Sequence, residues 1–566
     1  MSMLDWAILV GSLIFIVFYG LWKGRGQQDL KGYILAGNQS RWYVVAFSIM
    51  ATQASAITFL STPGQAYVDG MRFVQIYFGL PIAMVLLCMT LVPLYHRLKV
   101  YTAYEFLEKH LDLKTRVLTS VLFLIQRGLA AGFTIYAPAL ILSVILGWSI
   151  HVTTLIMGAL VIAYTFTGGS KAVSHTQFHQ MIIALGGMVI AFVVILRLIP
   201  DDVSFTDALQ VAGKSGRLSA LDFSFDLNNR YTIWSGILGG LFLSLSYFGT
   251  DQSQVQRYLG GRSTGESRIG LLFNGLLKIP MQFFILFVGV MVFVFYQFTA
   301  PPVFFNKAEV ESALVSGQGP AYQALEGRQE ALFQEKRSET YGMIKALRSG
   351  DDAEAARKQG RVLALHDSLK GVRKEAVGLL KTHNPAMSES DTNYIFLSFV
   401  TKYLPMGLLG IVLAVIFAAA MSSISAELAA LSSTTMVDVY RRMIKKDGSD
   451  RHYLVMSRLF TLGWGVYALF SAQLAGKMGS LIEAVNIIGS LFYGTILGIF
   501  VMAFYAKRVG GTAVFYGALL SEAMVIWLYN VSGISFLWFN AVGTVGVIVF
   551  AILLQTFLPS RRTAAR

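Results

Sequence analysis

Residues 417–440 read Phe-Ala-Ala-Ala-Met-Ser-Ser-Ile-Ser-Ala-Glu-Leu-Ala-Ala-Leu-Ser-Ser-Thr-Thr-Met-Val-Asp-Val-Tyr and continue a hydrophobic run that begins at Met406. A helix over this run, rising about 1.5 Å per residue, is long enough to cross a bilayer. Small and hydroxylated side chains recur on it at three- and four-residue steps and so form one stripe. The stripe consists of Ala419, Ser422, Ser423, Ala426, Ala430 and Ser433. It predicts a close helix–helix contact, and the adjacent serines also supply the hard oxygen ligands that an alkali cation needs.

The composition of the whole chain predicts an all-α membrane protein. Of the 566 residues, 55% are hydrophobic and 14% are charged, and the mean hydropathy is +0.58, which excludes an ordinary soluble domain. Apolar runs of roughly 18 residues or more predict about 13 transmembrane helices. The runs cover residues 4–22, 42–69, 73–96, 117–147, 151–167, 176–199, 232–258, 270–298, 407–438, 453–474, 481–505, 512–530 and 537–557.

Lysine and arginine residues in the loops predict the orientation. If the N-terminus lies outside, the expected inner loops carry 23 of these residues and the short outer loops carry two, Arg72 and Lys477. Because positive residues favour the cytoplasmic side, we expect a multi-pass protein of the inner or plasma membrane with the N-terminus outside and the C-terminus inside. This asymmetry accounts for the net charge of +14, and no basic soluble face suggests a nucleic-acid partner. The lone cysteine, Cys88, lies in an apolar span and predicts inert packing.

A polar insertion divides the membrane part. We expect transmembrane helices 1–8 in residues 1–299, a soluble helical insertion in 300–393 and transmembrane helices 9–13 in 394–566. Residues 307–391 contain 13 basic and 13 acidic side chains and predict two solvated helices, 320–348 and 353–382. Asp351 and Glu354 form a plausible capping box for the second helix. We expect an extracellular hairpin that caps the outer face, with a module for a protein partner as the alternative.

Two spans are interrupted by polar residues. The second contains Ser48–Gly64, which has a polar middle and ends in Pro-Gly. This pattern favours a helix broken near the membrane centre, where unwound carbonyls face a cavity or an ion, over a kinked but continuous helix. The seventh span ends in the polar segment Ser246–Tyr258, whose side chains must face protein or water. Residues 164–177 predict a glycine-containing inner turn between the fifth and sixth spans.

Three charged residues lie within the expected spans. Arg127 is interpreted as a buried structural charge rather than a ligand. Lys278 either extends to the inner surface or faces a cavity. Glu483 lies three residues before Asn486, so the two share one helical face. An acid in a span is a functional candidate, and pairing with Lys477 at the outer rim is the structural alternative.

Together, several elements resemble the sodium:solute symporter family, which includes the sodium/glucose cotransporters. They are Tyr164-Thr-x-Thr-Gly-Gly with Ala172-Val173 and Thr176, Tyr247-x-x-Thr-Asp-Gln252 with Gln256-Arg257, Lys278, and Ala419-x-x-Ser-Ser423 running to Asp438-Val-Tyr440. The resemblance covers nearly all of the membrane portion. It implies a LeuT-type fold of two inverted repeats of five helices, with ion and solute near the membrane midplane.

The resemblance also implies ligands for sodium, the only cofactor expected. They are the carbonyl groups of Ala51, Ala54 and Ala419 and the hydroxyls of Ser422 and Ser423. Five oxygens without a carboxylate suit a monovalent ion that must leave again. Family members that use a second sodium supply an aspartate where this chain has Gln177, and a hydroxyl where it has Ala426. We therefore expect one sodium per solute.

The residues expected to bind the solute come from the same segments. Those that match sugar-contacting positions of the family are Gln53, Thr58, Tyr77, Lys278 and Asn486. Polar residues of the neighbouring segments, Ser55, Gln75, Asp251, Gln252 and Glu483, complete the candidate set. Tyr247 matches the inner gate. Sugar carriers of the family have an acid where Tyr77 stands and a longer polar group where Thr58 stands.

These features predict a sodium-coupled secondary symporter, not an enzyme, that imports a small polar organic solute by alternating access. A sugar or polyol is favoured over a small carboxylate or vitamin-like anion. The rival from another class is a sensor that keeps the transporter fold and signals through the hairpin. No kinase-like domain follows Arg566, which counts against a sensor. A channel is disfavoured because no acidic ring or filter-like carbonyl run is visible.

Overall fold

The computed structural model describes residues 1–24, 34, 38–385, 387–476 and 479–558. It does not describe the side chains of residues 17, 20, 21, 23, 24, 164, 167–172, 174, 175 and 316. Helices are the only regular secondary structure of the described chain, apart from one isolated bridge between Ser40 and Gly261, so the all-α prediction is confirmed.

The helices fall into three groups along the chain. The first group is α1 (Met3–Gly24), α3 (Trp42–Gln53), α4 (Ala56–Asp69), η2 (Gly70–Tyr77), α5 (Leu80–Met89), α6 (Leu91–Leu98), α7 (Glu105–His110), α8 (Leu113–Leu146), α9 (Ile150–Leu198), α10 (Phe205–Lys214), η3 (Ser235–Gly239), α11 (Gly240–Gly249), α12 (Gln252–Leu259) and α13 (Thr264–Phe298). The insertion contributes α14 (Lys307–Ala313), η4 (Leu314–Gln318), α15 (Gly319–Ser349) and α16 (Asp352–His383). The last group is α17 (Thr392–Tyr403), α18 (Leu408–Thr434), η5 (Thr435–Ile444), α19 (Asp450–Ala475), α20 (Leu481–Tyr505), α21 (Gly511–Val531) and α22 (Phe536–Phe557).

Nine helical stretches of the described chain are long and apolar enough to cross a membrane. Three shorter apolar helices, Met3–Ile16, Ile150–Ala163 and Ser235–Gly249, lie in further expected spans. Each of the thirteen expected spans contains helix where it is described, but thirteen crossings stay a prediction. The structure assigns α9 as one element through the predicted turn at 164–177, most of whose side chains lie outside the described set.

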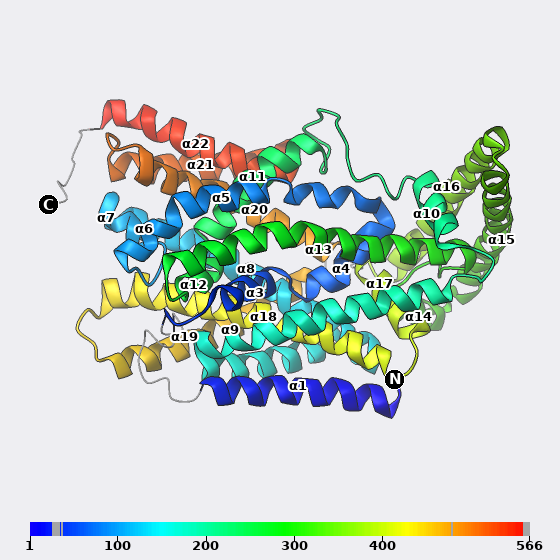
Figure 1. Ribbon diagram of the computed structural model, residues 1–566, viewed down its shortest axis with the longest axis horizontal. Helices are drawn as coiled ribbons and strands as arrows, with labels where there is room; N and C mark the ends of the chain where they lie inside the picture. The colour runs from blue at the N-terminus through cyan, green and yellow to red at the C-terminus, as the bar shows by residue number, and fades with distance from the viewer. Residues whose placement is uncertain (25–33, 35–37, 386, 477–478, 559–566) are drawn as a thin grey trace.

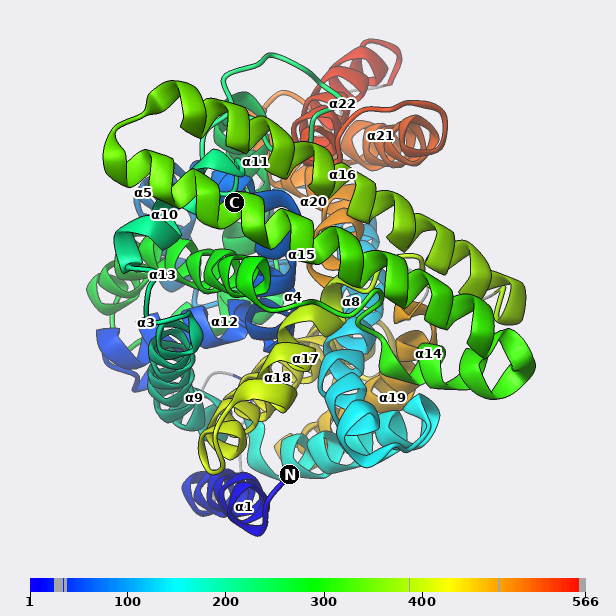
Figure 2. The ribbon, with the colours of Figure 1, turned by 90° about the vertical axis from the view of Figure 1, so that its right-hand side faces the viewer.

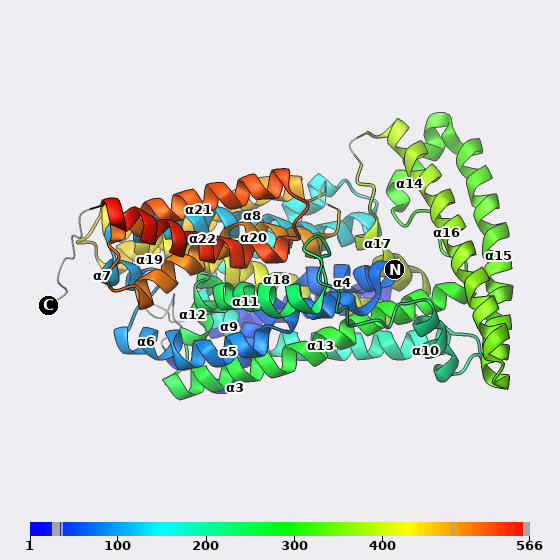
Figure 3. The ribbon, with the colours of Figure 1, turned by 90° about the horizontal axis from the view of Figure 1, so that it is seen from above.

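Most of the helices run along the longest axis of the molecule, as Figure 1 shows. The N-terminus lies at the same end as the α15–α16 hairpin, and the last helix, α22, ends at the opposite end (Figure 1). The hairpin helices stand across this axis and cover the end of the bundle (Figures 2 and 3). The N-terminus and the insertion therefore belong to one side, as the loop charges predict.

The helix with the small-residue stripe lies at the centre of the bundle. In the most apolar 18-residue segment of the stretch that contains α18, 89% of the residues are buried. The corresponding share in α19 is 33%. Helices α1, α3, α4, α8, α9, α12, α17 and α19 all contact it. Its alanines and serines let this many neighbours approach closely. The seam expected from the stripe is therefore present, as in the bonds from Ser422 Oγ and Ser423 Oγ to the Ala51 carbonyl of α3.

The second expected span is a broken helix. Helix α3 ends at Gln53 and α4 begins at Ala56, with Ser55 in an extended conformation between them. Pro63 and Gly64 do not cause the break, because both lie inside α4. A Cβ atom on Gly64 would lie 2.0 Å from the carbonyl oxygen of Thr392, so this glycine permits α17 to pack closely.

The seventh expected span is broken as well. Helix α11 ends at Gly249, and α12 begins at Gln252, after Asp251. Asp251 caps α12 by accepting from the Ser253 N–H at 2.8 Å. The two broken helices are five spans apart, which is the spacing that two repeats of five helices require.

The two helices predicted for the insertion are present as α15 and α16, while its extracellular position stays a prediction. Asp351 caps α16 by accepting from the Glu354 N–H at 3.0 Å, and Asn384 ends this helix. Arg348, at the end of α15, binds Asp207 of α10 at 2.6 Å and so ties the hairpin to the membrane part.

Candidate functional site

A cavity of about 100 Å³ lies beside the break in α3–α4, with α8, α11, α18 and α20 around it. Its lining residues are Thr52, Gln53, Ser55, Ile57, Thr58, Ile76, Tyr77, Arg127, Thr134, Leu243, Ser244, Tyr247, Phe248, Glu427, Ile482, Val485, Asn486 and Tyr493. Most of these side chains carry a hydroxyl, amide or charged group. This central cavity is therefore suited to a small polar molecule.

Two hydroxyls of α18 meet the carbonyl group of Ala51 in α3. Ser422 Oγ and Ser423 Oγ donate to this carbonyl oxygen at 3.3 and 3.1 Å. Both serines are buried, as are Ala54 at the break and Ala419 in α18. Three of the five predicted sodium ligands thus lie together, and the other two belong to the same two segments. Oxygens gathered beside unwound backbone form a plausible site for a monovalent cation.

Gln177 of α9 lies beside these serines. Its Nε2 donates to Thr52 Oγ1 at 3.0 Å and to the Ser422 carbonyl at 3.3 Å, and its Oε1 accepts from the Ser48 hydroxyl. The amide therefore joins α3, α9 and α18 by direct hydrogen bonds.

Six predicted residues line the central cavity, namely Gln53, Ser55, Thr58, Tyr77, Asn486 and the predicted gate Tyr247. Gln53 Oε1 is buried and has no hydrogen-bond partner among the described residues. The Tyr247 ring lies 5.9 Å from the Tyr493 ring, and its hydroxyl accepts from Gln254 at 2.7 Å. Solute binding by the first five of these residues and gating by Tyr247 stay predictions.

Lys278 of α13 lies next to this cavity. Its Nζ is 5.3 Å from the centre of the Tyr77 ring and has no hydrogen-bond partner within the described chain. The side chain is completely buried, so it does not extend to the inner surface. The burial excludes a position at the inner surface, but Lys278 is not among the residues that line the cavity, so contact with the solute stays a prediction.

Two predicted solute residues, Gln75 and Glu483, lie outside the cavity and are already hydrogen bonded. Gln75 donates to the Tyr231 carbonyl at 2.9 Å. Glu483 accepts from Arg230 at 2.8 Å and from the Tyr231 hydroxyl at 2.6 Å. Glu483 thus forms an ion pair, as its structural alternative predicts, but the partner is Arg230. Lys477, the partner expected from the sequence, lies outside the described residues.

Two more predicted residues, Asp251 and Gln252, lie at the α11–α12 break and do not line the cavity. Gln252 donates to the Tyr101 carbonyl at 2.9 Å and so ties α12 to the loop before α7. Asp251 accepts from the Tyr493 hydroxyl at 3.0 Å and forms an ion pair with Arg127. Asp251 therefore acts on the cavity through the residues that line it.

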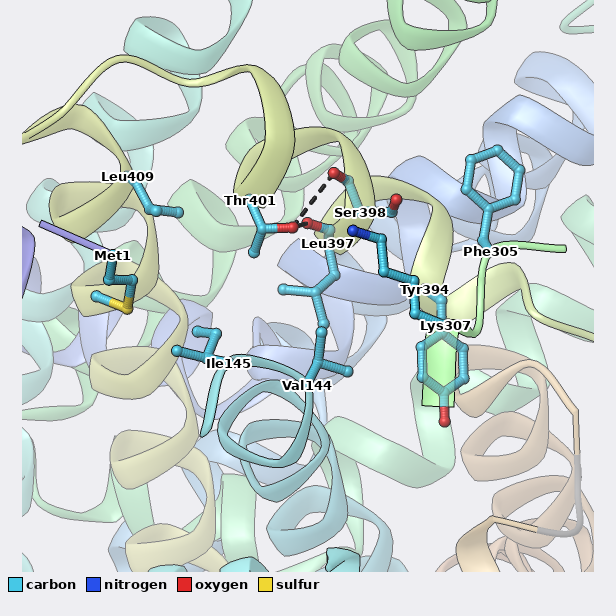
Figure 4. A pocket seen from close by; sticks show the side chains of 10 residues that line it. All are labelled: Met1, Val144, Ile145, Phe305, Lys307, Tyr394, Leu397, Ser398, Thr401 and Leu409. Atoms are coloured by element: carbon cyan, nitrogen blue, oxygen red, sulfur yellow. Dashed lines mark hydrogen bonds between the residues drawn. The ribbon is translucent and has the colours of Figure 1, made fainter. Parts of the chain in front are cut away.

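A separate pocket of about 180 Å³ lies near the N-terminus and contains none of the predicted site residues. Figure 4 shows apolar side chains such as Val144, Ile145 and Leu409 around it, with Tyr394 and Lys307 at one side. This pocket lacks the oxygen ligands and helix breaks of the central cavity, so it is the weaker candidate.

Comparison with known families gives a match to the sodium:solute symporter family over residues 33–322 and 377–521. The chain belongs to the sodium:solute symporter family. The unmatched residues between these segments, 323–376, fall in the α15–α16 hairpin, so most of this hairpin is an addition to the family's pattern.

Relatives of this symporter carry different solutes. The sodium/sialic acid symporter SiaT of Proteus mirabilis is 24% identical over 99% of this chain and 96% of its own length. A sodium-dependent multivitamin transporter of Oryctolagus cuniculus is 24% identical over 93% of this chain and 70% of its own length. A solved structure of a Na⁺-coupled sialic acid symporter in a substrate-bound outward-open state superposes with a TM-score of 0.76 at 21% identity, covering 99% of both chains. This match shows the LeuT-type fold.

This symporter is a multi-pass membrane transporter that couples a small solute to sodium, and it is not an enzyme. Arg127 and Glu427 line its central cavity, a position that the sequence did not predict for either residue. Arg127 Nη1 donates to Glu427 at 3.1 Å, Arg127 Nη2 donates to the Tyr493 hydroxyl at 2.5 Å, and its guanidinium lies 5.4 Å from the Tyr247 ring. The structural role predicted for Arg127 is present, but the side chain also faces the cavity. Glu427 was detectable, since it is the only acid between Met406 and Val437.

Proposed function

We propose that this symporter imports a small polyhydroxy solute, a sugar or polyol, together with one sodium ion by alternating access. Two buried polar atoms beside the central cavity support the choice. Gln53 Oε1 is an acceptor without a donor, and Lys278 Nζ is a donor without an acceptor, among the described residues. A hydroxyl group both donates and accepts, so one kind of solute group satisfies both atoms.

The charge of the cavity lining also favours a neutral solute. Arg127 is the only cation among the lining residues, and it is shared between Asp251 and Glu427. An incoming carboxylate would compete with two carboxylates that are already in place. Removing Arg127 from them would leave buried charges unpaired, which is costly.

A small carboxylate or vitamin-like anion is the second candidate. The unpartnered ammonium of Lys278 supports it, because an isolated buried cation gains most from an anion. The multivitamin and sialic acid transporters among the relatives show that the family handles more than one class of solute.

We propose that sodium binds between the Ala51 carbonyl and the hydroxyls of Ser422 and Ser423. Sodium there would favour the state in which the α3–α4 break and α18 are together, and so couple ion and solute. We also propose that the N-terminus and the hairpin face the outside, because they lie at one end of the bundle and the basic loops lie toward the other side.

Uptake by proteoliposomes tests the ion site. Purified protein should accumulate a sugar or polyol from a panel of radiolabelled solutes only when a sodium gradient is applied. The double substitution Ser422→Ala and Ser423→Ala should raise the sodium concentration needed for half-maximal uptake by about tenfold or more. Ser433→Ala is the matched control, because this buried serine of α18 donates to Ala430 of its own helix. Unchanged sodium activation in the double variant would contradict the assignment.

Lys278→Met separates the two solute classes. If a neutral polyol is the solute, the variant loses one hydrogen bond and uptake weakens by roughly tenfold. If a carboxylate is the solute, the variant loses the charge partner and transport is abolished. Uptake of a carboxylate but of no neutral solute by the parent protein would overturn the first proposal and support the second.

A further inference from the structure

A second cavity, of about 330 Å³, lies where the hairpin meets the outer ends of α4, α13 and α17. We call it the outer cavity. Its walls include Tyr67 of α4, Phe293 of α13, Lys336 of α15 and Arg373 of α16. Most of the hairpin lies outside the family match, so the walls that it supplies to this cavity are not part of the family's pattern.

Two cations of the outer cavity have no acidic partner. Lys336 is only 4% exposed, and Arg217 lies against the Phe293 ring, with its guanidinium 4.6 Å from the ring centre. Neither forms an ion pair with an acid in the described parts of the chain. Arg217 donates to the carbonyl of Val68, and Arg217 Nε has no hydrogen-bond partner there. The two positive charges thus face one space, and among the described acids only Asp69 of α4, which forms no ion pair with Arg217, partly offsets the charge of Arg217.

The other charges of this cavity are already balanced. Arg373 pairs with the buried Asp391, and Lys370 pairs with Asp367 at 2.9 Å on the exposed side. Glu389, the one acid among the lining residues, is bound to Lys381 outside the cavity. The positive excess therefore comes from Lys336 and Arg217.

The neighbouring groups reinforce this excess. Burial, together with the neighbouring Arg217, lowers the pKa of the Lys336 ammonium to about 8. Burial and the charges of Lys336, Arg217 and Lys370 lower the pKa of His366 to about 3, so His366 is neutral at physiological pH. Buried cations behave in this way when no anion is at hand, and an anion in the cavity would stabilise both.

Four of the other residues that line the outer cavity are aromatic. Tyr67, Phe293, Tyr296 and Phe305 lie in edge-to-face contact, with ring centres between 5.6 and 5.9 Å apart for the contacting pairs. All four line the outer cavity. A ligand with a flat apolar body would bury surface against these rings while its charged end faces Lys336 and Arg217.

We propose that the outer cavity binds a small organic carboxylate with an apolar body, with its carboxylate toward Lys336 and Arg217. The volume of the cavity is within the range of small-molecule sites. Lys370, exposed at the rim, marks the side from which solvent reaches it. The site is distinct from the central cavity, and it does not depend on which solute is transported.

Ligand-observed fluorine NMR with the full chain in lipid nanodiscs tests the site. The probes are 4-fluorobenzoate and the neutral 4-fluorobenzamide, which share the ring and differ in charge. We expect the acid to bind roughly tenfold more tightly than the amide. Lys336→Met should weaken binding of the acid by about tenfold, whereas Lys336→Arg, which keeps the charge, should retain it.

Lys345→Met is the matched control, because Lys345 is an exposed lysine of the same helix and does not line the cavity. Equal binding of the acid and the amide, or unchanged binding in Lys336→Met, would overturn the proposal. Loss of binding in Lys278→Met instead of Lys336→Met would place the anion in the central cavity and also overturn it. The protein should remain folded in Lys336→Met, because the substitution removes a buried charge that has no acidic partner.

Discussion

The central cavity and the outer cavity lie at opposite ends of α4, and each contains a buried cation. Thr58, near the start of this helix, lines the first, and Tyr67, near its end, lines the second. In the central cavity Arg127 is held by two acids and a tyrosine. In the outer cavity Lys336 and Arg217 have no acidic partner among the described residues.

This difference separates two uses of a buried charge. A cation that is already paired fixes the helices around it, and here Arg127 joins α8 to α18 and to the α11–α12 break. A cation without a partner can instead form an ion pair with a bound ligand. A paired cation suits the central cavity, where the helices must stay joined while the cavity changes shape. Unpaired cations suit the outer cavity, where an anion can bind.

The largest effect is expected from Arg127→Met. This substitution leaves Asp251 and Glu427 buried without a cation, which costs about 3–5 kcal/mol of folding free energy. We expect a large fall in thermal stability, measured by intrinsic fluorescence of the purified protein, and no sodium-driven uptake.

Arg230→Met is the control for this effect, because Arg230 also pairs with an acid but its side chain is 58% exposed. It should change stability by less than about 1 kcal/mol. Similar stability of Arg127→Met and Arg230→Met would show that the central charges are not tightly coupled, and the contrast between the two cavities would fail.

The pairing of Arg127 also shows where the sequence stops being informative. The apolar runs, the stripe of α18 and the caps of the hairpin are local patterns, so they were readable from the sequence. The contacts of Arg127 with Asp251 and Glu427 span 124 and 300 residues, and sequence alone does not say which acid meets which base. The sequence showed only that Arg127, Asp251 and Glu427 lie in apolar segments.

The solute residues show a second limit. Glu483 and Asn486 share a helical face, as predicted, yet only Asn486 lines the cavity. Three residues of a helix rise about 4.5 Å, which is enough to pass from the cavity to another environment. Periodicity identifies the face of a helix but not the depth at which a side chain meets its neighbours. Gln75 is a second example, because it was predicted to bind the solute and does not line the cavity.

The sodium stoichiometry tests the central region next. Gln177 already binds α3 and α18 where a second ion would need a carboxylate, so we expect one sodium per solute. At about 100 mV and a tenfold gradient, one sodium supplies roughly 3.7 kcal/mol and concentrates a neutral solute about 500-fold. Two sodium ions per solute would allow accumulation of roughly 10⁵-fold or more. Reversal potentials in proteoliposomes at varied gradients report the ratio, and a value of two would contradict the role given to Gln177.

Lys336→Met should stabilise the protein, by on the order of 2 kcal/mol at neutral pH. The pKa of Lys336 is about 8 in the folded protein, compared with an ordinary value of 10.5, so below pH 8 folding carries the cost of a buried charge. Between pH 8 and 10.5 the folded protein releases this proton while the unfolded chain keeps it, so the parent gains stability as pH rises. The advantage of the variant should therefore shrink over this range.

Thermal unfolding at pH 7 and pH 10 checks this prediction, with Lys345→Met as the control that should match the parent at both pH values. A Lys336→Met protein that is less stable than the parent at pH 7 would mean that an acid compensates this lysine. The outer cavity would then resemble the central one.

The smallest effect is expected from Arg348→Ala, which loosens the hairpin without touching either cavity. Arg348 binds both carboxylate oxygens of Asp207, at 3.1 and 2.6 Å, but its side chain is 52% exposed. An exposed ion pair contributes little to stability, so amide hydrogen exchange in α10 should speed up by less than about tenfold in the variant.

Arg348 and Ser204 hold the pKa of the Asp207 carboxyl at about 2, below its ordinary value of 3.8. The contribution of this ion pair to stability is therefore complete above pH 3.8 and is lost as the pH falls through 2. The difference in exchange rate between variant and parent, corrected for the intrinsic effect of pH on exchange, should thus be constant from pH 5 to pH 8. A difference that changes across that range would mean that another titrating group holds the hairpin, and His366, with its pKa of about 3, is not that group.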